Sequence, residues 1–150
     1  MPREIDPHFE ADERLFRSVS VDHVAEGQVL ASAVEVPRCS FNRAKYAPDP
    51  QSVFVASRPA DNGVVQLLAG DLPGPVPRPP KPPETVTLVP LEFYVVDHPE
   101  DDNAAHAEVR VRPTDQPGSP NYRIKDKGLR LKAQEALARK LSLLVPPTPT

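Results

Sequence analysis

The sequence is poor in several features that mark whole classes of protein. It has a single cysteine, Cys39, so no disulfide can form within the chain, which fits a reducing compartment. Its six glycines stand apart and form neither a GxGxxG nor a Walker pattern, so the usual nucleoside triphosphate sites are not expected. No apolar run approaches the ~20 residues of a membrane-spanning helix, and residues 1–13 lack the basic and apolar regions of a secretory signal. We therefore expect a cytoplasmic protein that does not contact a membrane.

Proline is the residue that the sequence has in excess, with 21 in 150 residues. Proline disfavours long helices and favours short strands, turns and extended segments. Seven prolines fall in residues 73–83, which we interpret as a polyproline II excursion at the surface. Neither side of this segment is long enough for a core of its own. The predicted organisation is a flexible N-terminus over 1–12, a single domain over 13–145 and a flexible tail over 146–150.

Short stretches of alternating or continuous apolar residues predict a sheet. The predicted strands are residues 14–21, 29–36, 63–70, 86–98 and 107–112. Residues 52–57 are expected either to pair with 63–70 in a hairpin or to form a short helix. Residues 39–48 are interpreted as a turn, with one short helical turn capped by Ser40.

Only residues 126–144 have the apolar spacing of a helix. The predicted stripe along this helix consists of Ala133, Leu137, Leu141 and Leu144. Together with the strands, it predicts an α+β fold in which a small mixed or antiparallel sheet is packed by one C-terminal helix.

Charge is distributed unevenly along the chain, although the net charge is only −3. Residues 1–120 carry 11 basic and 19 acidic side chains, whereas residues 121–150 carry 7 basic and 2 acidic ones. The basic C-terminal segment can contact phosphates, but a solvated or internally docked helix face explains it more simply. Nucleic-acid binding by 123–140 alone is the weaker interpretation, because Tyr122 is the only aromatic residue beside it.

Metal-binding and nucleophilic residues form no known motif. His98 and His106 are the strongest candidate pair of metal ligands, since they would face each other if the acidic stretch between them closed a hairpin. No pair of candidate ligands has CxxC, HxH or HExxH spacing, so we predict neither a metal nor a cofactor. Cys39 and Ser40 lack the sequence of a nucleophile elbow, so covalent catalysis is not predicted either.

A polar pocket is the most specific site that the sequence predicts. Arg17 falls on the apolar side of its predicted strand, and a buried guanidinium needs a carboxylate, several carbonyls or a bound phosphate as partner. We expect Arg17, Ser40 and Arg43 to bind a phosphate-bearing ligand, with His106 as catalytic acid or base. The alternative is that Arg17 pairs with an internal carboxylate and Arg43 only stabilises a turn.

The same side chains carry a resemblance. The stretches RLFRSV, SFNRAKY and NAAHAEVR contain Arg17, a Ser-x-Asn-Arg motif from Ser40 to Arg43, and an Asn-x-Ala-His motif from Asn103 to His106. In this order they resemble a loose group of small uncharacterised bacterial proteins, in scattered islands over residues 14–110. The resemblance implies a bacterial, cytoplasmic protein and carries no particular activity.

Two functions are therefore expected. The first is an accessory or binding component of a bacterial multi-protein assembly, with another protein as its partner. The alternative is a small enzyme or sensor that acts on a phosphate-bearing ligand, such as a nucleotide or RNA, through the predicted pocket. The sequence leaves open whether the protein is an enzyme.

Overall fold

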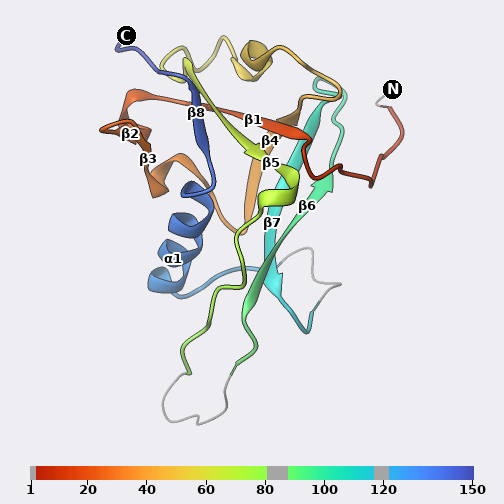
Figure 1. Ribbon diagram of the computed structural model, residues 1–150, viewed down its shortest axis with the longest axis vertical. Coiled ribbons are helices and arrows are strands. Elements are labelled where there is room, and N and C mark those ends of the chain that lie inside the picture. The colour runs from red at the N-terminus through yellow and green to blue at the C-terminus, as the bar shows by residue number, and fades with distance from the viewer. Residues whose placement is uncertain (1–2, 81–87, 117–121) are drawn as a thin grey trace.

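The computed structural model describes residues 3–80, 88–116 and 122–150 of the chain. Within these residues the chain forms a six-stranded antiparallel sheet, a two-stranded ribbon and one α-helix, as Figure 1 shows. The elements are β1 (Arg14–Val19), β2 (Val24–Ala25), β3 (Gln28–Val29), β4 (Arg38–Arg43), β5 (Gly63–Leu68), β6 (Leu91–Asp97), β7 (His106–Pro113), α1 (Lys127–Ala138) and β8 (Ser142–Val145). Short 3₁₀ helices are η1 (Val21–His23), η2 (Ala31–Ala33), η3 (Pro50–Val53) and η4 (Ala69–Asp71). The order across the sheet is β6-β7-β4-β1-β5-β8, and the predicted α+β fold is confirmed.

Helix α1 packs against the sheet through the apolar stripe that the sequence predicts. Asp126 caps its N-terminus by accepting a hydrogen bond of 3.0 Å from the backbone N–H of Leu129. Ala133 and Leu137 are completely buried and belong to the same apolar cluster as Leu15 of β1. Because an isolated helix of this length is marginal in water, burial of the stripe is what stabilises it.

We expect Leu137→Ala to lower the free energy of unfolding by about 2–5 kcal/mol, because it opens a cavity beneath the helix. Leu131→Ala is the matched control on the same helix, since the Leu131 side chain is 49% exposed and should cost less than about 0.5 kcal/mol. Denaturant melts of both variants measure the difference. Equal, small losses would show that the stripe does not hold the helix on the sheet.

Residues 44–62 cover the opposite face of the sheet. Phe16 of β1 and Asn42 of β4 are register partners whose side chains point to this face. Phe16 is completely buried there, and the Asn42 amide donates to the backbone carbonyl and the hydroxyl of Ser52 at 3.5 and 3.4 Å. Helix η3 contacts β1, β4 and β5 from the same side. Residues 52–57, predicted as a strand or a short helix, contain the end of η3 and no strand.

Strand β4 is the largest departure from the sequence prediction, which placed a turn and a short helical turn at 39–48. Residues 39–43 instead belong to a central strand that pairs with both β1 and β7, and the turn follows at 44–46. Cys39 and Phe41 alternate into the apolar cluster under α1. Arg43 occupies the next inward position. Because this residue is charged, the sequence lacks the alternation of inward apolar and outward polar residues that would indicate a strand.

The strand predicted over 29–36 is also wrong, because only its first residue belongs to β3 and the rest contains η2 and irregular backbone. The backbone carbonyls of Ala33 and Val34 accept hydrogen bonds from the side chains of Arg17 and Gln134, at 2.8 and 3.0 Å. Side chains from β1 and α1 therefore satisfy the polar groups that a neighbouring strand would otherwise satisfy.

The helix predicted over 126–144 is too long. Helix α1 ends at Ala138, and the chain turns back into β8, which pairs with the edge of β5. Leu141 is buried and Leu143 half-buried, while Leu144, predicted on the helix stripe, is exposed. The open edge of β5 offers backbone groups that need partners, so it captures this segment as a strand.

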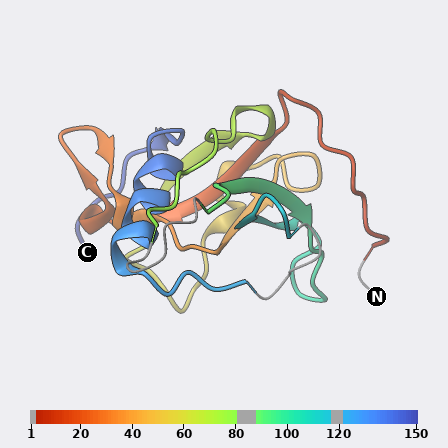
Figure 2. The ribbon, with the colours of Figure 1, turned by 90° about the horizontal axis from the view of Figure 1, so that it is seen from below.

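Other predictions agree with the structure more closely. The residues predicted to face inward in β7, Ala107, Val109 and Val111, are all buried. Residues 81–83 of the predicted polyproline segment lie outside the described residues, and earlier in that segment Val76 forms an isolated bridge with Leu91 of β6. The flexible termini and the single domain stay predictions. Seen from below in Figure 2, the N-terminal segment runs along the side of the molecule away from α1.

Candidate functional site

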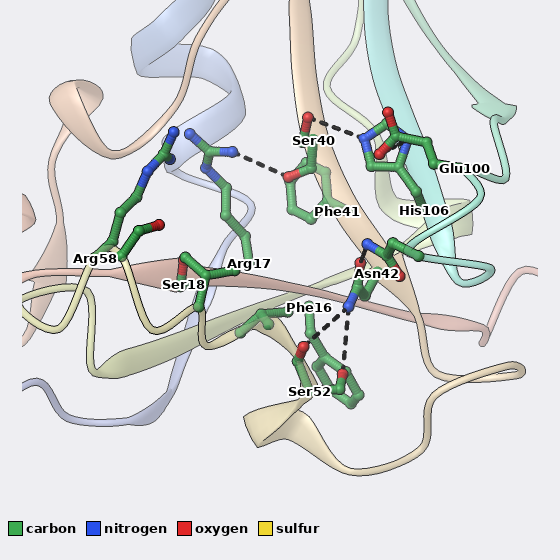
Figure 3. Close-up of a pocket in the computed structure, with 14 residues that line it drawn as sticks. Phe16, Arg17, Ser18, Ser40, Phe41, Asn42, Ser52, Arg58, Glu100 and His106 are labelled. Carbon is green, nitrogen blue, oxygen red and sulfur yellow. Dashed lines mark hydrogen bonds and ion pairs between the residues drawn. The ribbon is translucent and has the colours of Figure 1, made fainter.

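A pocket of about 370 Å³ opens beside β1 and β4, and loop 44–62 and the β6–β7 hairpin also line it (Figure 3). Three of the four side chains that the sequence predicts to converge lie on its wall, namely Arg17, Ser40 and His106. They come from three different strands, and the antiparallel pairing of β1, β4 and β7 brings them together. The fourth predicted residue, Arg43, does not line this pocket.

Arg17 occupies a gap between β1 and β4. These strands pair only at Leu15–Arg43 and Phe16–Asn42 and then separate. The Arg17 guanidinium lies beyond that point and donates from Nε to the carbonyl of Ala33 and from Nη1 to the carbonyl of Ser40, at 2.8 and 3.0 Å. Its partners are thus carbonyls, one of the arrangements expected for a buried arginine, and no described carboxylate forms a salt bridge with it. The half-buried guanidinium at the pocket wall is therefore held by carbonyl oxygens and has no carboxylate counter-ion among the described residues.

Arg58 supplies a second cation from loop 44–62. Its side chain is exposed, and in Figure 3 its guanidinium points the same way as that of Arg17. Among the described residues, no carboxylate forms a salt bridge with Arg58. Two guanidinium groups that lack carboxylate partners in one pocket repel each other, and an anion bound between them would relieve that repulsion.

His106 is buried at the opposite wall of the pocket. Its Nε2 lies 3.1 Å from the Ser40 hydroxyl, and its Nδ1 lies 2.8 Å from the backbone carbonyl of His98. With the proton on Nδ1, the ring donates to that carbonyl and accepts the hydroxyl proton of Ser40, which is the arrangement of a nucleophile beside its base. The Glu100 carboxylate lies 3.5 Å from Nδ1. Figure 3 shows Ser40, His106 and Glu100 in this order along the wall.

Arg43 lies away from the pocket, where it is completely buried. Its five N–H groups are all used, by both carboxylate oxygens of Glu13, by Oδ1 of Asp97, and by the backbone carbonyls of Asp6 and His8. Arg43 has no donor left for a ligand, so it cannot make the phosphate contact that the sequence predicts. Its role is to attach the N-terminal segment to the sheet.

Folding lowers the pKa of two carboxyl groups near Arg43, those of Asp97 and Asp6. Burial opposes the charge of Asp97, but hydrogen bonds from Arg3, the Asp6 backbone N–H and Arg43 outweigh it and lower the pKa of this carboxyl. Hydrogen bonds from Lys45 and Tyr46 likewise lower the pKa of Asp6. The cluster is therefore a charged network with complete hydrogen bonding, as burial of an arginine requires.

Cys39 has no catalytic environment. It is completely buried, and burial raises the pKa of its thiol, so the reactive thiolate is disfavoured. Its side chain belongs to the apolar cluster under α1 and contributes to packing.

Sequence reasoning missed several polar groups of the pocket, among them Arg58, Ser57 and Glu100. Arg58 lies in an irregular loop and leaves no pattern. Glu100 has a usable signal, because it lies between two histidines in a stretch that the sequence already suggests as a hairpin turn. That hairpin is present, with the His98 backbone N–H donating to the His106 carbonyl at 3.1 Å.

Comparisons with protein-family models, with curated proteins and with solved structures find no match. The resemblance to small bacterial proteins therefore stays a prediction. Among the described residues, no helix has both the length and the apolar character needed to cross a membrane.

Proposed function

We propose that this protein binds a small phosphate-bearing ligand, such as a nucleotide or a short stretch of RNA, in the pocket between Arg17 and Arg58. The observation that carries the proposal is the pair of guanidinium groups on one pocket wall, neither of which has a carboxylate partner among the described residues. Phosphate is the anion that planar guanidinium groups bind best. The pocket volume of about 370 Å³ falls within the ~300–1,000 Å³ of small-molecule sites.

The rest of the wall suits such a ligand. The hydroxyls of Ser18 and Ser57 offer polar contacts to sugar or base edges. His106 is the proposed acid or base, with Ser40 as its hydrogen-bond partner. A sensor needs only the binding groups, whereas an enzyme also needs His106.

The test is isothermal titration of the full chain with a nucleoside monophosphate, and separately with inorganic phosphate. We expect Arg58→Ala to weaken nucleotide binding by roughly 10–100-fold, because a charge-assisted hydrogen bond contributes about 1.5–3 kcal/mol. Arg58 is exposed, so this substitution leaves the fold intact, whereas Arg17→Ala also removes two contacts to the backbone. Affinity should fall as salt rises.

Arg139→Ala is the matched control, since the Arg139 side chain is 76% exposed on α1, away from the pocket. It should leave nucleotide binding unchanged. Equal affinity of the Arg58→Ala, Arg17→Ala and wild-type chains would remove the proposal. If bound nucleotide is turned over, His106→Ala should abolish turnover and keep most of the binding.

One observation favours a second role, that of an accessory component in a bacterial assembly. Residues 73–77 of the proline-rich segment line one groove together with the outer side of α1 and the residues after it, and its wall carries Lys132, Arg139 and Lys140 beside Glu135. Prolines beside cations suit an extended acidic peptide of another protein. Titration with an acidic peptide, followed by chemical-shift changes at Lys132, tests this role, and unchanged shifts would eliminate it.

A further inference from the structure

We propose that the tip of the β6–β7 hairpin binds a divalent transition-metal ion, with zinc as its natural occupant, through His98, Glu100 and His106. The sequence predicts no metal because the spacing of these residues matches no known motif. The hairpin nevertheless brings one ligand atom from each of the three side chains within 4.8 Å of the others. The proposal does not rest on the phosphate ligand, but an ion on Nδ1 of His106 excludes the acid or base role proposed above for this residue.

Two of the three distances between the ligand atoms match those of a zinc site. Nδ1 of His98 lies 3.2 Å from Nδ1 of His106, and Oε1 of Glu100 lies 3.5 Å from the same His106 atom. Zinc–nitrogen bonds of about 2.0–2.1 Å in a tetrahedron separate neighbouring ligand atoms by about 3.3–3.4 Å. These two separations lie on either side of this value. The third, between the ligand atoms of His98 and Glu100, is within 4.8 Å, and the exposed Glu100 side chain is free to adjust to the ion.

The backbone of the hairpin holds the two imidazoles in place. The rings are 5.2 Å apart between centroids at an interplanar angle of 71°, and a backbone hydrogen bond of 3.1 Å joins their residues. Glu100 and Asn103 exchange two backbone hydrogen bonds that close the turn between them. A site on a closed hairpin has little ordering cost, because folding has already fixed the backbone of its ligands.

Ser40 provides the outer contact that a metal-bound imidazole requires. A ligating histidine is normally oriented through its second nitrogen, and Nε2 of His106 lies 3.1 Å from the Ser40 hydroxyl. When Nδ1 binds the ion, the ring gives up its hydrogen bond to the His98 carbonyl, and the ring proton moves to Nε2 and is donated to Ser40. A hydroxyl can donate or accept, so Ser40 supports both tautomers of the His106 ring.

The ligand types favour zinc over magnesium or calcium. Two imidazoles and one carboxylate suit zinc and similar transition ions, whereas magnesium and calcium require oxygen ligands. Three protein ligands leave a fourth position open to solvent. The ion would also neutralise Glu100, the one carboxylate that lines the pocket in the described part of the chain.

The metal site and a nucleophilic Ser40 exclude each other. An ion on Nδ1 makes Nε2 a donor, and the ring then cannot remove the Ser40 proton. A serine–histidine pair also gives no role to the Nδ1 atom of His98, which faces the same His106 nitrogen. The metal site uses both histidines, and for this reason we prefer it.

The experiment is a competition titration of the tag-free full chain, freed of metal by a chelator, with Zn²⁺ against a chromogenic indicator. We expect saturable binding of one ion per chain, and no competition from Mg²⁺ at the same concentration. His98→Ala and Glu100→Gln should each weaken Zn²⁺ binding at least tenfold. Both side chains are exposed, so neither substitution threatens the fold. Titration with Co²⁺ should produce the intense visible absorption of a four-coordinate site.

Two matched controls separate this site from ordinary surface chelation. Asp101→Asn removes a neighbouring acidic group of the turn, and His8→Ala removes an exposed histidine elsewhere, so both variants should bind Zn²⁺ as the wild type does. The proposal would be overturned if Zn²⁺ binding were not saturable, or if His98→Ala bound Zn²⁺ as well as the wild type does. An equal loss of Zn²⁺ affinity in Asp101→Asn would overturn it too. So would a Co²⁺ spectrum as weak as that of the aqueous ion.

Discussion

Arg43→Ala should lower the free energy of unfolding by about 3–5 kcal/mol, the usual loss when one partner of a buried charge network is removed. The guanidinium is completely buried and bonds Glu13 at 2.6 and 2.8 Å and Asp97 at 3.1 Å. Without it, two largely buried carboxylates and two backbone carbonyls lose their donors. Denaturant unfolding of the wild-type and variant chains measures the loss.

Arg43→Lys separates charge from geometry in this test. Lysine keeps the positive charge but has three donors in place of five, so its cost should lie between zero and that of Arg43→Ala. Arg139→Ala, which removes an exposed arginine with a weak contact of 3.8 Å to Glu135, should change stability by less than about 0.5 kcal/mol. A loss below 1 kcal/mol for Arg43→Ala would show that the N-terminal segment is not attached through this network.

The same network predicts how stability depends on pH. The pKa of Asp97 is lowered by folding, so its contribution is complete above the unfolded value of about 4 and is lost as the pH falls through the lower folded value. The stability difference between wild type and Arg43→Ala should therefore shrink as the pH falls below about 4. A difference that stays constant down to pH 2 would contradict this reasoning.

Division of the chain within residues 73–83 should abolish folding of both fragments. The sheet order interleaves strands from the two sides of this segment, because β4 pairs with β7 and β5 pairs with β8. The first fragment would keep β1, β4 and β5 without the helix that covers them. The second would keep a hairpin, a short helix and a single edge strand, which is too little for a stable core.

Circular dichroism and thermal melts of the separately expressed fragments provide the measurement. Neither should show a cooperative transition, whereas the intact chain should show one. In a matched control, a glycine–serine linker of equal length replaces residues 77–83, and this chain should still fold, since only connection of the two parts is required. Two independently folded fragments would defeat the prediction of a single domain.

The sequence by itself determines the elements whose local pattern and tertiary environment agree. In β7, Ala107, Val109 and Val111 alternate with charged residues and are buried as predicted, because both neighbouring strands place their apolar side chains on the same face. The stripe at Ala133 and Leu137 likewise predicts the buried face of α1. Apolar periodicity alone was sufficient for these elements.

The candidate site was predictable in part. An arginine on the apolar side of a strand must find partners, and Arg17 finds two carbonyls at the edge of the pocket that also contains Ser40 and His106. The reasoning did not extend to Arg58, because the position of an irregular loop depends on contacts with distant strands. The pairing of His98 with His106 was visible as a hairpin, but the distances between their nitrogens depend on backbone geometry.

Only the tertiary structure decided the strand β4, the role of Arg43 and the end of the C-terminal helix. A charged residue at an inward position is acceptable only when distant groups compensate it, and here Glu13 and Asp97, 30 residues before and 54 residues after Arg43, supply the compensation. Residues 142–145 carry leucines that a helix or a strand can bury equally well. The unpaired edge of β5 selects the strand, because its backbone groups gain hydrogen bonds that no local pattern in the sequence can reveal.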